Sequence, residues 1–228
     1  MHISPNAARY ELKFVASPVL MPWIEQWIGS HAAGFYEAHP PRQVNSLYLD
    51  TFDLDAYRDN LSGSSSRFKV RFRWYGEEAD ASPGTLEVKR RENGLGYKES
   101  FVTGSVSLSG TSWRDLRRLL RSELVGEGRI WLDGNPLAVL INRYWRRYFV
   151  SADSRVRVTV DWGQRVYDQR PYAAPNLSRH AHLPDAAVVE FKFSPEDRPV
   201  ASALLQGFPL RVSRNSKYVI GVQATLSG

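Results

Sequence analysis

The segment Arg67–Trp74 alternates strictly between cationic and apolar residues. Successive side chains of a β-strand point to opposite faces, so this pattern predicts a strand with one cationic and one apolar face. The cationic face consists of Arg67, Lys69, Arg71 and Arg73. Cations this close together repel each other unless an anion neutralises them. We therefore expect this face to contact an anionic ligand.

Three more segments show the same alternation with acidic residues among the cations: Thr85–Arg91, Arg155–Trp162 and Val188–Phe193. Their opposite faces carry mainly aliphatic and aromatic residues. A single face of this kind is also typical of a solvent-exposed strand. Four concordant faces favour strands that together surround a polyanion. The polar faces consist of Glu87, Lys89 and Arg91, then of Arg155, Arg157, Thr159 and Asp161, and then of Glu190 and Lys192.

Shorter patterns predict further strands and helices. The Pro-rich segment Val166–Ala187 lacks periodicity, and we expect a long loop there. Further strands are expected at Tyr10–Val15, Ser46–Leu49, Tyr97–Val102, Arg143–Val150 and Val212–Val222. Capping residues and apolar periodicity predict helices that begin at Ser17 or Pro22, Asp53, Ser112, Asn135 and Ser194.

About eight strands with helices between them predict an α+β fold. We expect a closed antiparallel β-barrel with a charged interior and an apolar outer face that the helices cover. A membrane porin shares this inverted pattern, but amphipathic helices between the strands argue against one. Residues 1–228 contain no internal repeat, low-complexity tract or linker, so one domain is expected.

Composition adds a preference for anionic partners. The formal net charge is +6 and the sequence pI is about 9.6, which favours nucleotides, polyphosphate, nucleic acid or an acidic membrane surface. The absence of cysteine excludes disulfides, thiolate metal sites and cysteine nucleophiles. Met1–Glu11 lacks the apolar core of a signal peptide, and no apolar run approaches the ~20 residues of a spanning helix. We expect a cytoplasmic protein, with a peripheral position at the inner face of the membrane as an alternative.

Seven short motifs follow one another along nearly the whole chain. They are Arg9-Tyr10-Glu11-x-Lys13, Ser46-Leu47-Tyr48-x-Asp50-Thr51, Arg71-Phe72-Arg73-Trp74-Tyr75, Leu86-Glu87-Val88-Lys89, Asn142-Arg143-Tyr144, Val189-Glu190-Phe191-Lys192 and Ser216-Lys217-Tyr218. Each motif alone is weak, but their ordered succession is specific. It resembles the vacuolar transporter chaperone (VTC) domain, in the polyphosphate polymerase branch of the triphosphate tunnel metalloenzymes.

The resemblance implies a tunnel-shaped barrel that binds ATP, triphosphate or polyphosphate together with Mn²⁺ or Mg²⁺. It makes several residues candidates for the site, and the strand faces agree with these assignments apart from Lys98, Arg143, Arg214, Ser216 and Lys217, which rest mainly on the resemblance. The catalytic candidates are Arg71, Arg73, Lys89, Arg143 and Arg157. The phosphate-binding candidates are Lys13, Lys69, Lys98, Lys192, Arg214, Ser216 and Lys217. Glu190 is the candidate metal ligand, with Glu11 and Glu87 as further candidates.

Arg9 departs from the wider superfamily, which carries a glutamate at this position in a Glu-x-Glu-x-Lys motif. One lost carboxylate weakens a two-metal hydrolytic arrangement and suits the polymerase branch. In fungi the domain is accompanied by an inositol-phosphate-sensing domain and membrane helices, and neither is found among these 228 residues. A membrane-protein partner is a further expectation.

The expected activity is that of an ATP-dependent polyphosphate polymerase-like phosphotransferase. A metal-dependent inorganic or nucleoside triphosphatase would share the site and use water as the acceptor. A non-catalytic module that binds polyphosphate or nucleotides is the alternative from another class. Nucleic acid is not expected, because Glu11, Glu87 and Glu190 share faces with the cations and would repel a phosphate backbone.

Overall fold

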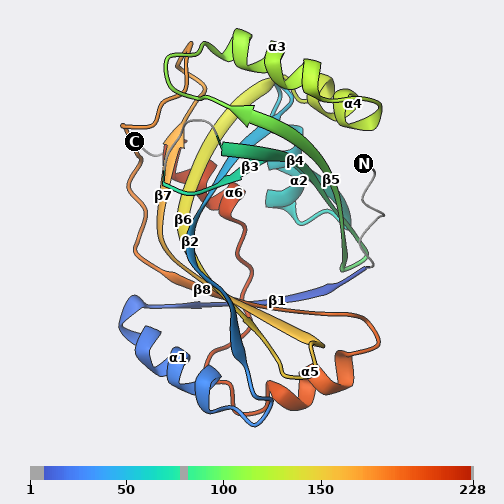
Figure 1. Cartoon of the computed structure of the whole chain (residues 1–228), viewed down its shortest axis with the longest axis vertical. Coiled ribbons are helices and arrows are strands. Elements are labelled where there is room, and N and C mark those ends of the chain that lie inside the picture. The colour runs from blue at the N-terminus through green and yellow to red at the C-terminus, as the bar shows by residue number, and fades with distance from the viewer. Residues whose placement is uncertain (1–7, 78–81, 227–228) are drawn as a thin grey trace.

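The computed structural model describes residues 8–77 and 82–226. Within these residues, eight strands form one antiparallel sheet in the order β1-β8-β7-β6-β2-β3-β4-β5, and the sheet curves into a barrel (Figure 1). The strands are β1 (Tyr10–Ala16), β2 (Tyr36–Asp50), β3 (Ser66–Tyr75), β4 (Ser82–Glu92), β5 (Leu95–Val106), β6 (Leu137–Val150), β7 (Val156–Asp168) and β8 (Ala187–Phe193).

The edge strands β1 and β5 meet where the barrel closes. Arg9 and Gly96 exchange two backbone hydrogen bonds of 3.2 Å each, while no continuous ladder joins these strands in the described part of the chain. The α+β class and the antiparallel eight-stranded barrel are therefore confirmed. Backbone pairing between the two edges consists of this isolated bridge.

Helices lie outside the barrel, as expected from the apolar outer faces of the strands. Figure 1 shows α3 and α4 at one end of the molecule, α1 and α5 at the opposite end, and α2 and α6 between them. None of the described helices is long and apolar enough to cross a membrane. The helices are η1 (Pro18–Leu20), α1 (Met21–Ser30), α2 (Asp55–Ser62), α3 (Trp113–Glu123), α4 (Glu127–Gly134), α5 (Arg198–Leu204) and α6 (Lys217–Leu226).

The alternating segment Arg67–Trp74 forms β3, and its apolar face packs outward against α3. Phe72 and Trp74 are buried in one cluster with Leu116 and Leu120. Burying an aromatic or leucine side chain contributes about 1.5–3 kcal/mol. This outer core fixes the rotation of β3, and as a consequence its cationic face must point into the barrel.

A second apolar cluster covers the other end of the barrel. Val158 of β7 and Phe191 of β8 pack with Ile24 and Ile28 of α1 and with Leu204 of α5. The two clusters lie on the outer surface of the same sheet. Because both outer faces are apolar, the polar faces of β7 and β8 are also directed inward.

The start of α2 is capped from the end of β2. The buried carboxylate of Asp50 accepts hydrogen bonds from the backbone N–H groups of Ala56 and Tyr57, both at 3.0 Å. The expected cap at Asp53 is wrong, because Leu54 adopts a left-handed conformation (φ 57°) and the helix begins at Asp55. Asp50 also accepts a 2.6 Å hydrogen bond from the Tyr218 hydroxyl of α6.

Two further element predictions are wrong. The second half of the expected strand Val212–Val222 is the start of helix α6, which begins at Lys217, because Val219 and Val222 recur at helical spacing and are buried. The helical turn expected to begin at Asn135 is instead the end of α4. The Asn135 side chain donates a 2.8 Å hydrogen bond to the Trp131 carbonyl oxygen.

Close packing of α6 on the barrel generates a testable prediction. A Cβ atom at Gly221 would lie 2.3 Å from Cδ2 of the buried Leu140. Gly221→Ala is therefore expected to destabilise the protein by about 1–3 kcal/mol through overpacking, although alanine favours helices. Gly134→Ala is the matched control, because a Cβ atom added there at the end of α4 would meet no atom within 4 Å. Urea unfolding measures both, and equal stability of the two variants would contradict the close approach.

Candidate functional site

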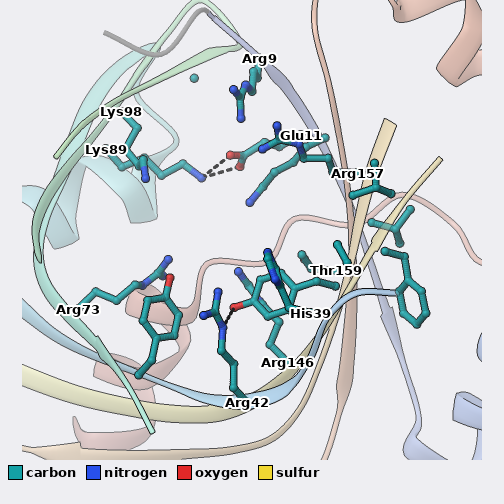
Figure 2. A pocket seen from close by; sticks show the side chains of 18 of the residues that line it. Arg9, Glu11, His39, Arg42, Arg73, Lys89, Lys98, Arg146, Arg157 and Thr159 are labelled. Atoms are coloured by element: carbon teal, nitrogen blue, oxygen red, sulfur yellow. Dashed lines mark hydrogen bonds and ion pairs between the residues drawn. The ribbon is translucent and has the colours of Figure 1, made fainter. Parts of the chain in front are cut away.

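A cavity of about 660 Å³ lies inside the barrel (Figure 2). Among the described residues, six arginines, three lysines and one glutamate line it. In Figure 2 these side chains surround an open centre and come from opposite walls of the barrel. Such an excess of positive charge in an enclosed space concentrates anions. The charged lining residues are Arg9, Arg42, Arg71, Arg73, Arg146, Arg157, Lys89, Lys98, Lys192 and Glu11.

Glu87 of β4 organises the wall that β3 and β4 form. Its buried carboxylate lies 2.6 Å from Arg71, 3.5 Å from Arg73 and 3.2 Å from Lys98. Burial alone would raise the pKa of Glu87, but Arg71, Arg73 and Lys98 hold it well below its ordinary value. Glu87 is therefore a fixed anion that holds three cavity cations in place, and its expected role as a further metal ligand remains a prediction.

A second buried anion, Asp161 of β7, organises the opposite wall. Its carboxylate lies 2.5 Å from Arg146 of β6 and 2.6 Å from Lys217 at the start of α6. Burial raises the pKa of Asp161, yet Arg146 and Lys217 lower it to about 2. The Lys217 ammonium also lies 4.6 Å from the centre of the Tyr144 ring. This cluster joins α6 to the barrel interior.

After Glu87 and Asp161, a third group of acidic side chains consists of Glu190 and Glu11, which lie on the neighbouring strands β8 and β1. Glu190 is buried and lies 3.6 Å from Lys13 and 3.2 Å from Lys192. Burial raises its pKa, but Lys192, Lys13 and other cations hold it well below the ordinary value. Glu11 lies 2.5 Å from Lys89, and dashed lines mark this ion pair in Figure 2. Burial and the opposing Glu11 carboxylate together leave the pKa of Lys89 at about 8.

Lys69 differs from these cations because its described partner is a hydroxyl group. Its ammonium donates a 3.0 Å hydrogen bond to Ser216, immediately before α6. Burial lowers the pKa of Lys69 well below its ordinary value, and the neighbouring cations, of which Lys13 has the largest effect, lower it further. Lys13 itself donates a 2.9 Å hydrogen bond to the Asn215 carbonyl oxygen. The segment before α6 therefore covers the interior beyond the cavity.

The structure brings most of the predicted residues to the barrel interior. The predicted residues that line the cavity are Arg71, Arg73, Lys89, Lys98, Arg157, Lys192 and Glu11. The predicted residues that contact this group, or lie just beyond it toward α6, are Lys13, Lys69, Glu87, Glu190, Ser216 and Lys217. Their roles in binding phosphate or metal remain predictions.

Two predicted residues lie elsewhere. Arg143 is on the opposite face of β6 from Tyr144 and Arg146, and its guanidinium lies 5.8 Å from the Tyr167 ring, which is part of the outer core. The expected place of Arg143 in the cavity is therefore corrected, and Arg146 lines the cavity instead. Arg214 is exposed in the segment before α6, outside the cavity lining.

The sequence interpretation did not assign three of the arginines that line the cavity to the site: Arg9, Arg42 and Arg146. Arg146 and Arg147 are adjacent, so both faces of β6 carry a cation. The sequence alone therefore does not indicate which of the two arginines points into the barrel. The spacing Tyr144-x-Arg146-x-Tyr148 was the available signal, since it alternates as a strand requires. Arg42 follows two prolines, which are unusual inside a strand, so the sequence did not indicate a strand in this half of β2. In the structure the pairing of β2 with β6 is irregular between His39 and Arg42.

The fold and the cavity define an α+β barrel with a cationic interior. The family model of the VTC domain matches residues 8–226. The chain therefore belongs to the VTC domain family, which confirms the resemblance drawn from its motifs. A comparison with curated proteins gave no match.

Solved structures resemble this chain at low sequence identity. A putative adenylate cyclase from Vibrio parahaemolyticus gives a TM-score of 0.52 at 13% identity, covering 97% of this chain and 99% of that one. A putative adenylyl cyclase from Hippeastrum, described as having a dominant triphosphatase activity, gives a TM-score of 0.49 at 14% identity. That comparison covers 99% of this chain and 96% of the other. At these identities the likeness concerns the fold alone.

The Asp161 cluster generates a prediction about stability. Asp161→Asn leaves Arg146 and Lys217 buried without their anion, and we expect a loss of about 3–5 kcal/mol in unfolding free energy. Asp133→Asn is the matched control, because Asp133 also contacts two arginines but its side chain is 40% exposed, so its loss should stay below about 1 kcal/mol. Urea unfolding at neutral pH compares the variants, and similar losses would contradict the assigned role.

The same cluster predicts a pH dependence. The folded-state pKa of Asp161 is about 2, below the value of about 3.9 expected in the unfolded chain. A depressed carboxyl pKa contributes stability above the unfolded value, and this contribution disappears as pH falls from about 4 to 2. The wild-type protein should lose about 2 kcal/mol from this source over that range. The Asp161→Asn variant should lack this component of the acid sensitivity in unfolding measurements.

Proposed function

We propose that this protein binds the triphosphate of ATP in its cavity and transfers the γ-phosphoryl group to the end of a polyphosphate chain. The observation that carries this proposal is the charge of the lining, where nine cations among the described residues accompany one carboxylate. Donor and acceptor are both polyanions in such a reaction. A cavity with this surplus of cations reduces the repulsion between them more than a site for one small anion would need.

The arrangement suits phosphoryl transfer, in which positioning and charge stabilisation supply most of the acceleration. Arg71 and Arg73 are two residues apart on β3, so their backbones are separated by roughly 7 Å, a spacing that lets them contact neighbouring phosphates. Their guanidinium groups offer planar pairs of donors for phosphate oxygens. Glu87 fixes both arginines before the ligand arrives, so little side-chain ordering remains.

The proposed reaction balances without proton transfer. A terminal oxyanion of the polyphosphate chain attacks the γ-phosphorus of ATP, and the bond from that phosphorus to the β,γ-bridging oxygen breaks. ADP leaves with the electron pair, and the chain gains one phosphate. Water as the acceptor would have to lose a proton. The carboxylates Glu11, Glu87, Glu190 and Asp161 are all ion-paired with cations, which makes them weak general bases.

The carboxylate oxygens of Glu190 and Glu11 are suitable ligands for a hard divalent cation such as Mg²⁺ or Mn²⁺. Their carboxylates interact electrostatically, and Mg²⁺-type ions are commonly held by one or two carboxylates with substrate phosphates as further ligands. The described residues contain no cluster of three or more acidic or histidine side chains that could hold a metal alone. When bound, Mn²⁺ or Mg²⁺ would neutralise charge on the phosphate oxygens. Lys13 and Lys192 would keep Glu190 ionised for this role.

A triphosphatase is the second candidate, and the far end of the interior favours it. Lys13 and Lys69 are hydrogen-bonded to Asn215 and Ser216 before α6, and none of these residues lines the cavity. A growing chain would need a continuous path past this segment. For hydrolysis of a bound triphosphate, one open end of the cavity would be enough, because substrate and products could pass through it.

The first prediction separates these two functions. The protein should convert ATP with Mn²⁺ into acid-stable polymer, which a gel detects beside an assay for orthophosphate. Arg157→Ala removes an exposed cation of the lining and should reduce polymer formation at least about tenfold, the effect of losing one charged hydrogen bond. Arg155→Ala is the control, since Arg155 contacts Asp197 outside the cavity, and should change the rate less than about twofold. Release of orthophosphate alone would defeat the polymerase in favour of the triphosphatase.

A second prediction concerns Glu190 and the metal. Mn²⁺ should tighten the binding of tripolyphosphate to the wild-type protein, as measured by calorimetry. Glu190→Gln should abolish most of this enhancement, while binding without metal should be equal or tighter, because a negative charge has been removed near the site. Glu99→Gln provides the control from the Glu99–Arg90 pair, at 3.3 Å and outside the cavity. An undiminished Mn²⁺ effect in the Glu190 variant would remove Glu190 from the metal site.

A further inference from the structure

Arg42 is held at the cavity in a different way from the arginines of its walls. Its guanidinium carbon lies 4.1 Å from the centre of the Tyr75 ring and 4.8 Å from that of Tyr148. Its Nε also donates a 3.3 Å hydrogen bond to the Tyr148 hydroxyl, marked in Figure 2. By contrast, Arg71 and Arg146 are ion-paired with buried carboxylates. Arg42 is thus positioned by aromatic rings from β3 and β6.

More aromatic residues surround this part of the cavity. His39 packs edge-on against Tyr148, with the ring centres 5.6 Å apart. Tyr36, which is 52% exposed, and Tyr97 also line the cavity. Aromatic faces contribute little to binding phosphate oxygens, which prefer N–H and O–H donors. They do provide flat surfaces for stacking, as an arginine guanidinium also does.

The register of the strands places Arg42 farther along the barrel than the arginines assigned to phosphate. On β2, Arg42 is four residues from Ser46, which pairs with Arg73 of β3. At roughly 3.3 Å per residue, the two levels are separated by about 13 Å. Arg146 pairs directly with Arg42 across β2 and β6, and its side chain reaches Asp161. A triphosphate at the level of Arg71 and Arg73 would bring its organic substituent toward Arg42 if the substituent points away from the segment before α6.

We infer that Arg42, Tyr75 and Tyr148 form a subsite that stacks the base of a nucleoside triphosphate. This inference rests on the proposed function and specifies which donor the cavity selects. Stacking uses the flat face of a base and not the pattern of its hydrogen-bonding edge, so the subsite discriminates a nucleotide from inorganic triphosphate and accepts different bases. Larger purine rings should stack more strongly than pyrimidines.

The first test measures the binding of ATP, GTP, CTP and tripolyphosphate to the wild-type protein by calorimetry. Mn²⁺ and Mg²⁺ are left out, so that no turnover takes place. ATP and GTP should bind about 5- to 150-fold more tightly than tripolyphosphate, the effect of stacking one base. Tripolyphosphate carries more negative charge than ATP, so charge alone predicts the reverse order. Equal or tighter binding of tripolyphosphate would overturn the subsite and leave triphosphate binding intact.

The second test uses variants. Arg42→Lys keeps the charge but loses the planar group. It should weaken the binding of ATP about 5- to 50-fold and change the binding of tripolyphosphate less than about twofold. Arg157→Lys is the matched control, which should affect both ligands to the same degree because it alters a phosphate contact. Tyr148→Phe keeps the stacking ring and loses the hydrogen bond to Arg42, so ATP binding should weaken less than in Arg42→Lys. Circular dichroism checks that the variants are folded.

The outcomes separate the subsite from the proposed function. Equal weakening of ATP and tripolyphosphate by Arg42→Lys would make Arg42 an ordinary phosphate-binding cation and overturn the stacking subsite. Failure of the wild-type protein to bind either ligand would overturn the proposed function, and the subsite with it. Selective weakening of ATP supports both.

Discussion

Neutralisation of charge inside the barrel is the constraint on which the rest of the structure depends. Cations in a poorly hydrated interior are costly unless anions lie beside them. Pairing between strands supplies these anions directly: Lys13 lies opposite Glu190, Arg71 opposite Glu87, and Arg146 opposite Asp161. A shift of one residue in any of these strands would turn the charged side chain toward the apolar outer layer. The charge pairs and the outer core therefore specify the same register.

The neutralisation is complete in some parts of the interior and incomplete at the cavity. Where Asp161 meets Arg146 and Lys217, the charges hold α6 against the barrel and serve the fold. At the cavity the cations outnumber the acids among the described residues, and the surplus is available to a ligand. The same residue type thus has two functions, determined by whether a carboxylate lies opposite. Arg42, positioned by aromatic rings, represents a third situation and suggests a third kind of contact.

Prediction from the sequence succeeded where a strand has two chemically distinct faces. The alternation in β3, β4, β7 and β8 indicated both the barrel and most of its inward cations, because an apolar face must be covered and the opposite face is then enclosed. Prediction failed for the position of Arg143, since the adjacent arginines of β6 indicated no single inward face. It also failed for α6, whose valine-rich sequence is compatible with a strand until packing against β6 selects the helix.

The sequence by itself determined the alternating faces, the surplus of positive charge and the family, because these depend only on which residues are present and in what order. Only the tertiary structure decided which cations remain available for a ligand. That outcome depends on which residues lie opposite each other across strands far apart in the chain, such as Lys89 beside Glu11. It also depends on the segment before α6, which brings Ser216 to Lys69 from a distance of 147 residues along the chain. Local patterns carry no information about such contacts, since they arise only when the sheet curves and brings its edges together.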